Sequence, residues 1–296
     1  MAEPAADVGA SDVSPLRSWI IRHPIATFLV LVYATTTSLV FVPKGLTEPR
    51  LLPGGATPHG ILENVLGSAA PAFIVTALVT GKAGVWDLAR RSFRWRVSLR
   101  WYLISLLAPL LIFLIAITFL YGLAPLRALA QNWLLLFTAF VPALAIMILL
   151  NNVAEEIGWT GFVFARFQDR HGPLRAALLT TVFFWLFHVP SFYVETRSWA
   201  TTALALGIFL LPHLGSRVIT GWLYNSAGFS VLIAGLFHSM HNAIVNPTGL
   251  VAVVGLPQFE VLVIMAGIVV LAAAIIAIAT RGRLGLKRSS AAGAAT

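Results

Sequence analysis

Glu155 and Glu156 stand next to each other inside a long apolar run that resumes at once with WTGFVFARF. An ionised carboxylate in apolar surroundings is costly, and intramembrane acids usually serve a function. Such a carboxylate can activate water or bind a metal ion. The alternative is that the helix has already ended and the pair lies in a solvated loop. The apolar residues that follow favour the functional interpretation.

Histidines and an asparagine recur in two later apolar runs. His188 lies in FFWLFHVPSF, with Phe184 one turn before it, and a lone histidine there is typical of a packed core residue. His238 and Asn242 are four residues apart and share one helical face, with His241 about 60° to the side. Hydrogen bonding between helices is the structural alternative for this cluster.

The three polar segments are expected to lie at similar depths in the membrane. At about 1.5 Å per helical residue, measured from the expected cytoplasmic ends near Arg166, Pro173 and Gly228, Glu155 lies about 16 Å deep, His188 about 22 Å and His238 about 15 Å. Independent structural side chains have no reason to converge at one depth. The convergence therefore predicts one buried site.

Three motifs carry a resemblance to a known family. EEIGWTGFVFARFQ at 155–168, FxxxH from Phe184 to His188, and HxxxN from His238 to Asn242 resemble the motifs of the CPBP intramembrane proteases, also called the ABI family. That family includes the type II CAAX prenyl endopeptidases. The flanking sequence is similar too, so the resemblance covers roughly 60–247.

The resemblance implies an intramembrane endopeptidase that cuts a peptide bond near the cytoplasmic side of the membrane. By motif position, Glu155 and His188 would activate the attacking water, while His238 and Asn242 would stabilise the oxyanion. Amide hydrolysis needs these two functions, a base for water and donors for the oxyanion. The residues in supporting positions are Glu156, Thr160, Phe184 and His241.

Metal chemistry is the alternative to side-chain chemistry alone. The family is often labelled metalloprotease, and Glu155, His188 and His238 could together ligate zinc. However, no HExxH-type pair fixes two ligands on one helix, and Asn242 would be a poor zinc ligand. We therefore expect no cofactor, with a divalent metal such as zinc as the alternative.

Thr160 departs from the first motif, which is commonly EExxxR. Glu156 should therefore lack its cationic partner one turn away, and we expect Thr160→Arg to be tolerated or stabilising. The departure leaves open a non-catalytic scaffold or immunity protein on the same fold. A proton-coupled transporter is a third interpretation, but the sequence has no paired broken helices in two related halves.

The composition is that of a multi-pass membrane protein. Of 296 residues, 58% are hydrophobic and only 10% are charged, against about a quarter in soluble domains. The absence of cysteine excludes disulfides and cysteine nucleophiles. The net charge of +9 lies in short loops and indicates topology signals and anionic-lipid contacts, with no nucleic-acid partner. Expected partners are a peptide or membrane-protein substrate and the lipid bilayer, and the oligomeric state stays open.

Eight apolar runs are long enough to span a membrane, which needs about 20 residues. They are 24–42, 64–80, 101–122, 133–165, 174–192, 199–215, 228–246 and 258–280. The fourth is too long for one straight crossing and should tilt, kink or break. We predict an all-α polytopic bundle in the cell membrane, with a single domain over 17–285 and disordered tails at 1–16 and 286–296.

Basic residues predict the orientation of this bundle, because cytoplasmic loops collect lysine and arginine. With the N-terminus inside, sixteen of the 20 basic residues, Arg217 among them, fall on the cytoplasmic side. The four outside are Lys44, Arg50, Arg127 and Arg197. The stretch GVWDLARRSFRWRVSLRW at 84–101 mixes aromatic residues with arginines and should lie along the cytoplasmic interface.

This orientation makes a testable prediction. Tags at both termini should be accessible from the cytoplasm, and single cysteines introduced at 43–62 should label with an impermeant maleimide from outside. The cysteine-free native chain is a ready background for that labelling. A C-terminal tag accessible only from outside would contradict the predicted topology.

Overall fold

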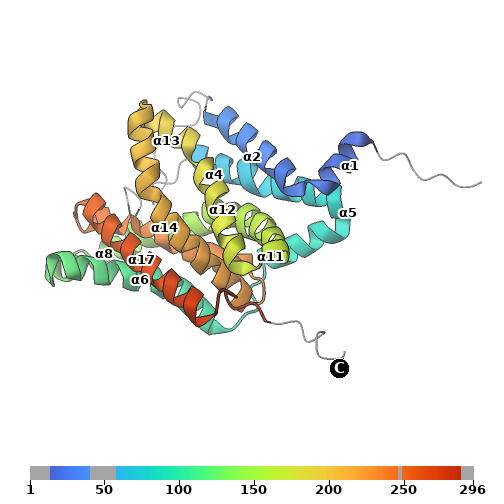
Figure 1. The fold of residues 1–296 in the computed structure, drawn as a ribbon. Coiled ribbons are helices and arrows are strands. Elements are labelled where there is room, and N and C mark those ends of the chain that lie inside the picture. Colours follow the sequence, from blue (N-terminus) through green and yellow to red (C-terminus); the bar gives the residue numbers. More distant parts are fainter. Residues whose placement is uncertain (1–13, 41–57, 246–248, 288–296) are drawn as a thin grey trace, which may run out of the picture.

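The computed structural model describes residues 14–40, 58–245 and 249–287, and within these ranges the chain forms helices and no strands (Figure 1). This confirms the all-α polytopic bundle. The helices in order are α1 (Pro15–Arg22), α2 (Pro24–Val40), α4 (Pro58–Asn64), η2 (Val65–Ala69), α5 (Ala70–Ser92), α6 (Leu99–Tyr121), α7 (Ala124–Gln131), α8 (Trp133–Leu135), η3 (Leu136–Phe140), α9 (Val141–Ile146), η4 (Met147–Asn152), α10 (Val153–Glu156), η5 (Ile157–Phe164), α11 (Ala165–His171), α12 (Pro173–Phe187), α13 (Val189–Thr196), α14 (Trp199–Ser226), α15 (Val231–Val245), α16 (Leu250–Val253) and α17 (Gln258–Ala279).

The number of spans differs from the predicted eight. Among the described residues, 6 helical runs are long and apolar enough to cross a membrane, or up to 7 if the bent pair α1 and α2 counts as one span. The predicted span 228–246 is α15, which has only 15 residues. At about 1.5 Å per residue it is shorter than the roughly 30 Å of a bilayer core. A count of eight is therefore not confirmed.

The fourth run, predicted to tilt, kink or break, forms one helical run without a break. From Trp133 to His171 the chain alternates between α-helical pieces and the π-helical turns η3, η4 and η5. The turn η5 begins directly after Glu156, and π-helical turns inside α-helices are frequent at functional sites. The Glu155–Glu156 pair therefore lies inside a continuous helical run, and the solvated-loop alternative is wrong.

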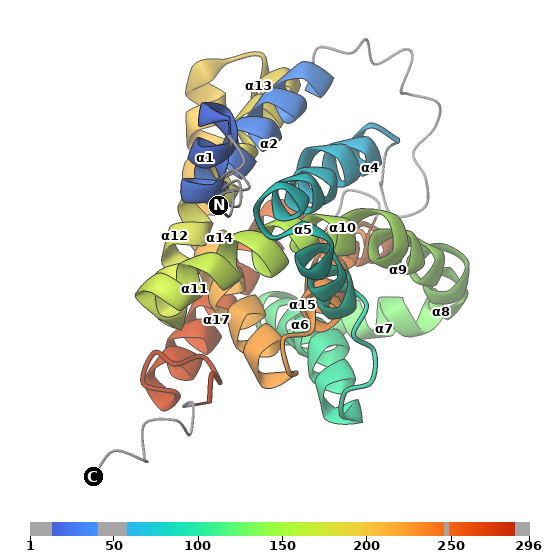
Figure 2. The ribbon, with the colours of Figure 1, turned by 90° about the vertical axis from the view of Figure 1, so that its right-hand side faces the viewer.

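The short helix α15 forms the centre of the bundle, in contact with α6, α10, η4 and α14 (Figure 2). Its close approach to α10 depends on Gly235. A Cβ atom at that position would lie 2.8 Å from the side chain of Val153, so only glycine lets the two helices meet there. Because His238 follows Gly235 by about one turn, the contact brings it beside the glutamate pair.

Helix α14 extends well beyond the predicted span 199–215 and ends at Ser226. Arg217 is therefore a helical residue only 3% exposed, and its prediction as a cytoplasmic loop cation is wrong. Without Arg217, fifteen basic residues stand against four, and because the orientation also assumed eight spans, it stays a prediction. The sequence rule failed because it assigns any arginine at the end of an apolar run to the water phase.

The ends of the chain lie mostly outside the described residues, and so do most of the predicted tails 1–16 and 286–296. Within the described part, α1 already begins at Pro15.

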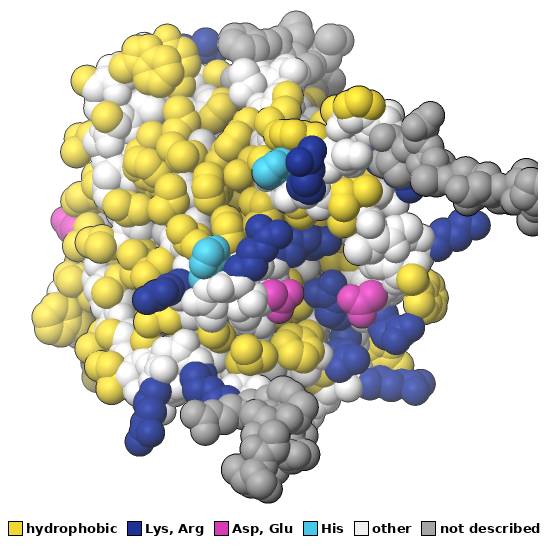
Figure 3. Space-filling model, turned by 45° about the vertical axis from the view of Figure 1, so that its right-hand side comes forward, with side chains coloured by type: hydrophobic (Ala, Val, Ile, Leu, Met, Phe, Trp, Pro, Cys, Tyr) yellow, Lys and Arg dark blue, Asp and Glu magenta, His cyan; other side chains and the backbone are white. Residues whose placement is uncertain are grey.

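On the surface, Lys and Arg side chains gather in a band below a broad apolar expanse (Figure 3). An apolar belt beside a basic band is the surface that a lipid bilayer requires. The chain is a multi-pass membrane protein.

Candidate active site

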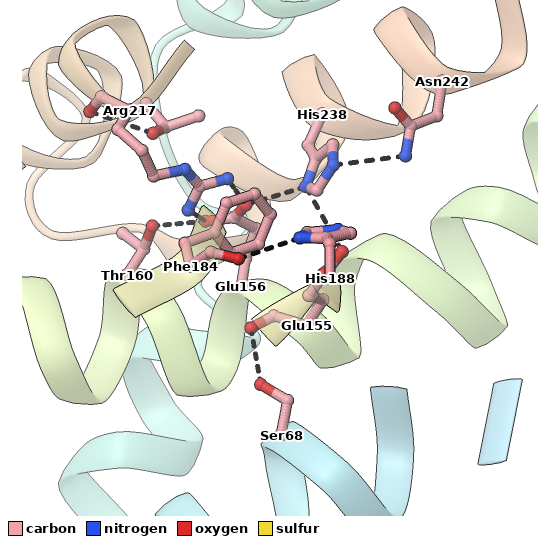
Figure 4. Close-up of polar contacts among 10 residues, drawn as sticks. Ser68, Glu155, Glu156, Thr160, Phe184, His188, Arg217, His238 and Asn242 are labelled. Carbon is pink, nitrogen blue, oxygen red and sulfur yellow. Dashed lines mark hydrogen bonds and ion pairs between the residues drawn. The ribbon is translucent and has the colours of Figure 1, made fainter. Parts of the chain in front are cut away.

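Glu156 is the most completely buried acid of the described chain, with an exposed fraction of 0%. Its carboxylate accepts four hydrogen bonds: one from the Thr160 hydroxyl, two from the Arg217 guanidinium and one from His238 Nδ1 (Figure 4). Since a carboxylate offers about four lone-pair sites, this group is saturated. Glu156 therefore serves as an anchor that ties α10 to α14 and α15.

Arg217 supplies the positive charge that Glu156 was expected to lack. It reaches across from α14, its Nη1 lies 3.0 Å from Glu156 Oε2, and its Nη2 pairs with the other carboxylate oxygen. Thr160 takes part as a hydroxyl donor to the same carboxylate. The prediction that Glu156 lacks a cationic partner is therefore wrong. The cation comes from another helix, α14, instead of from the next turn of the same helix. The expectation that Thr160→Arg is tolerated loses its basis.

His238 links the anchor to Asn242. Its Nδ1 lies 2.8 Å from Glu156 Oε1, and its Nε2 lies 3.2 Å from Asn242 Nδ2. Because the carboxylate only accepts and the amide nitrogen only donates, His238 must carry its proton on Nδ1 and accept at Nε2. Both ring nitrogens are thereby engaged. Asn242 keeps a second N–H for another acceptor.

Glu155 and His188 face this cluster from the other side (Figure 4). Glu155 is 4% exposed, its backbone oxygen accepts from Ser68 Oγ at 3.0 Å, and its Oε2 lies 3.8 Å from His238 Nδ1. It is close enough to His188 to interact electrostatically. His188 Nδ1 donates to the Phe184 carbonyl at 2.8 Å, which leaves Nε2 as an acceptor. The structure therefore places both side chains beside the Glu156–His238 pair, and their catalytic roles stay predictions.

Phe184, the first residue of the FxxxH motif, packs its ring among three polar side chains. The Arg217 guanidinium lies 4.2 Å over the ring, and the rings of His188 and His213 approach it at 4.8 and 5.1 Å. A buried cation over an aromatic face gains attraction from the ring quadrupole. Phe184 thus holds Arg217 and His188 in place.

A cavity of about 540 Å³ opens beside these residues, between α14 and α17. Its walls are mostly apolar, and its polar lining consists of His213, Ser216, Arg217, Thr220, His238, His241 and Asn242. The volume is in the range of ligand sites, which run from about 300 to 1,000 Å³. His238 and Asn242 line the cavity, whereas Glu155 and His188 are not among its lining residues. His241 also lines it, and its buried Nδ1 has no hydrogen-bond partner among the described residues.

The donor set does not fit a zinc ion bound by Glu155, His188 and His238. A ligating histidine offers a nitrogen lone pair to the metal, but both His238 nitrogens are engaged with Glu156 and Asn242. In the part of the chain that the structure describes, no three His, Asp or Glu side chains gather as a metal site. We therefore derive no step through a metal.

The sequence did not predict that Arg217 and His213 belong to this site. His213 lies 5.1 Å from His188 between ring centroids and lines the cavity. A signal for both was present: His213 interrupts an apolar run, and Arg217 follows it one turn later. Polar residues at that spacing share a helical face, which could have marked α14 as part of the site.

The buried ion pair between Glu156 and Arg217 predicts that Arg217 stabilises the fold. Breaking a buried ion pair by removing one partner costs about 3–5 kcal/mol, because the other charge stays buried and unpaired. We expect Arg217→Gln to lower the Tm of the detergent-solubilised protein strongly, with Arg217→Lys intermediate because it keeps the charge and loses the two-pronged contact. An unchanged Tm for Arg217→Gln would contradict the assigned anchor. The matched control is Arg175→Gln, a basic residue on the neighbouring α12 that makes no hydrogen bond or ion pair with the described residues of the site.

Comparison with known proteins agrees with this geometry. The family model described as type II CAAX prenyl endopeptidase Rce1-like matches residues 137–244. A similar protein is the CAAX prenyl protease 2 of Methanococcus maripaludis, which is 30% identical over 109 residues. That match covers 36% of this chain and 40% of the relative, so the chain spans about two fifths of the relative's length. The matched segment contains Glu155, Glu156, His188, Arg217, His238 and Asn242, and over this segment the chain is similar to the type II CAAX prenyl endopeptidases.

Proposed function

We propose that this protein is an intramembrane endopeptidase that hydrolyses a peptide bond with a water activated by Glu155 and His188. The observation that carries the proposal is the division between the two glutamates. Glu156 is saturated by four hydrogen bonds, whereas Glu155 lies between His188 and His238. A saturated carboxylate is a poor base, so the proton-accepting role falls to Glu155.

The proposed reaction follows from this arrangement. Glu155 takes a proton from a water that also donates to His188 Nε2, and the water oxygen attacks the carbonyl carbon of the substrate. The free N–H of Asn242 donates to the oxyanion that forms. Glu155 then returns the proton to the nitrogen of the leaving amine as the C–N bond breaks. His238 acts as a positioning residue here, because both its nitrogens are already engaged.

The substrate is proposed as a peptide or a membrane-protein segment that reaches the cavity beside α14 and α17. The relative from Methanococcus is named a prenyl protease, and an apolar cavity of about 540 Å³ could receive an apolar group. We propose that cleavage occurs near the cytoplasmic side, in line with the orientation expected from the basic loops. The non-catalytic scaffold loses its main support, because the cation absent at Thr160 is supplied by Arg217.

The roles of the two glutamates predict different effects of the same substitution. Glu155→Gln keeps shape and hydrogen bonding but cannot take a proton, so the rate of cleavage should fall about 10²–10⁴-fold. The abundance and the Tm of this variant should stay near those of the wild type. Initial rates of product formation, followed by mass spectrometry on co-expressed substrates, measure the effect.

Glu156→Gln is the matched control, one residue away on the same helix. It removes the charge that pairs with Arg217, so we expect a lower Tm and lower abundance before any effect on rate per folded molecule. Normal cleavage by Glu155→Gln at normal abundance would rule out Glu155 as the base.

The role proposed for Asn242 predicts that its removal slows the chemical step of cleavage and leaves substrate binding unchanged. Removing one oxyanion donor costs about 10²–10³-fold in kcat, because the donor acts mainly in the transition state. For Asn242→Ala we expect this loss with KM nearly unchanged, whereas Ser239→Ala, one turn earlier on the same helix and outside the cavity lining, should cleave normally. A rise in KM with normal kcat would instead place Asn242 in ground-state substrate binding.

A further inference from the structure

The end of α5 and the turn toward α6 form an exposed surface that the proposed reaction does not use. A second cavity of about 540 Å³ lies on it. Its main lining side chains are three aromatic residues and three arginines: Trp86, Phe93, Trp95, Arg90, Arg94 and Arg96. We call this the basic-aromatic surface. It lies in the stretch that the sequence predicts along the membrane interface.

The aromatic residues of this surface are largely exposed. Trp86, Phe93 and Trp95 have exposed fractions of 65%, 64% and 62%. Exposed tryptophan in membrane proteins is enriched at the level of the lipid headgroups, where the ring meets both hydrocarbon and water. The occupant of this surface should therefore have an apolar part beside its polar part.

The charge of the surface is positive and has no local counter-charge. No acidic side chain lines the cavity, and the acid closest in sequence, Asp87, already pairs with Arg91 at 2.9 Å. The Arg96 guanidinium lies 4.9 Å over the Trp95 ring, which keeps it at the rim of the cavity. Arginines gathered at a membrane interface attract anionic headgroups. The polar part of the occupant should therefore be an anion.

Contacts of this segment connect it to the helices of the candidate site. Arg94 Nη1 donates to the Gly228 carbonyl at 2.7 Å, and Ser230 Oγ donates to the Arg94 carbonyl at 2.7 Å. Arg91 Nη1 donates to the Gly161 carbonyl of η5 at 3.2 Å. The basic-aromatic surface is thus fixed against the turn that precedes α15, and a ligand bound there would rest on an ordered support.

We propose that the basic-aromatic surface binds an anionic phospholipid, with the arginines at its phosphate and the aromatic rings beside its glycerol and upper acyl chains. An anion alone would account for the arginines and leave the three exposed rings without a role. An uncharged lipid would account for the rings and leave the arginines without one. Only a ligand with both parts matches the whole surface.

The test is lipid binding by the purified full chain in detergent, measured by native mass spectrometry during titration with dioleoyl phosphatidylglycerol or dioleoyl phosphatidylcholine. We expect tighter binding of phosphatidylglycerol, and a loss on the order of tenfold in its affinity for the double variant Arg90→Gln/Arg96→Gln. Arg94 is left intact because it bonds to Gly228. The matched control Arg281→Gln/Arg283→Gln removes the same charge beyond α17 and should keep the affinity.

Three results would overturn the proposal. The first is equal affinity of the wild type for the two lipids. The second is an equal loss in both double variants, which would mean that only the net charge attracts the lipid. The third is competition by glycerol phosphate at the concentrations at which the lipid binds, which would mean a soluble-phosphate site. None of these results depends on peptide cleavage, so they leave the proposed function to its own tests.

Discussion

The buried pair of Glu156 and Arg217 positions the polar side chains of the candidate site. Both side chains are almost completely removed from solvent, at 0% and 3% exposure, and each would be very costly alone. Pairing them ties α10 to α14, and the remaining lone pairs of the carboxylate fix Thr160 and His238. His238 in turn orients Asn242. One ion pair thus aligns side chains from three helices that meet deep in the bundle.

The pair also gives two neighbouring glutamates different surroundings. Successive residues on a helix point about 100° apart, so Glu155 and Glu156 meet different surroundings even though both carboxylates approach His238 Nδ1. Glu156 faces α14 and α15, where four donors saturate it. Glu155 turns toward His188 and the end of α12, where its carboxylate faces His238 at 3.8 Å. Glu156 thus holds the helices together, and the chemical role is proposed for Glu155.

Much of this could be predicted from the sequence, because it depends on local patterns. Apolar runs gave the helical segments, and the spacing from Phe184 to His188 and from His238 to Asn242 gave shared helical faces. The origin of the cation could not be predicted: Arg217 lies 61 residues from Glu156 along the chain, and only tertiary packing brings them together. The same holds for His213 and for the cavity beside α14. The length of α15 was overestimated because apolar composition does not distinguish a buried core helix from a spanning one.

The central claim is that Arg217 replaces a cation otherwise placed one turn after Glu156, and it can be tested by moving the arginine. Thr160→Arg alone should lower the Tm, since it forces a second guanidinium against one carboxylate in a site that is 1% exposed. Arg217→Met alone should lower it as well. The decisive measurement is the Tm and cleavage rate of the double variant Thr160→Arg/Arg217→Met. The account predicts that the double variant recovers most of the stability that each single variant loses, with cleavage restored alongside. A double variant as unstable as the sum of the two single variants would contradict it.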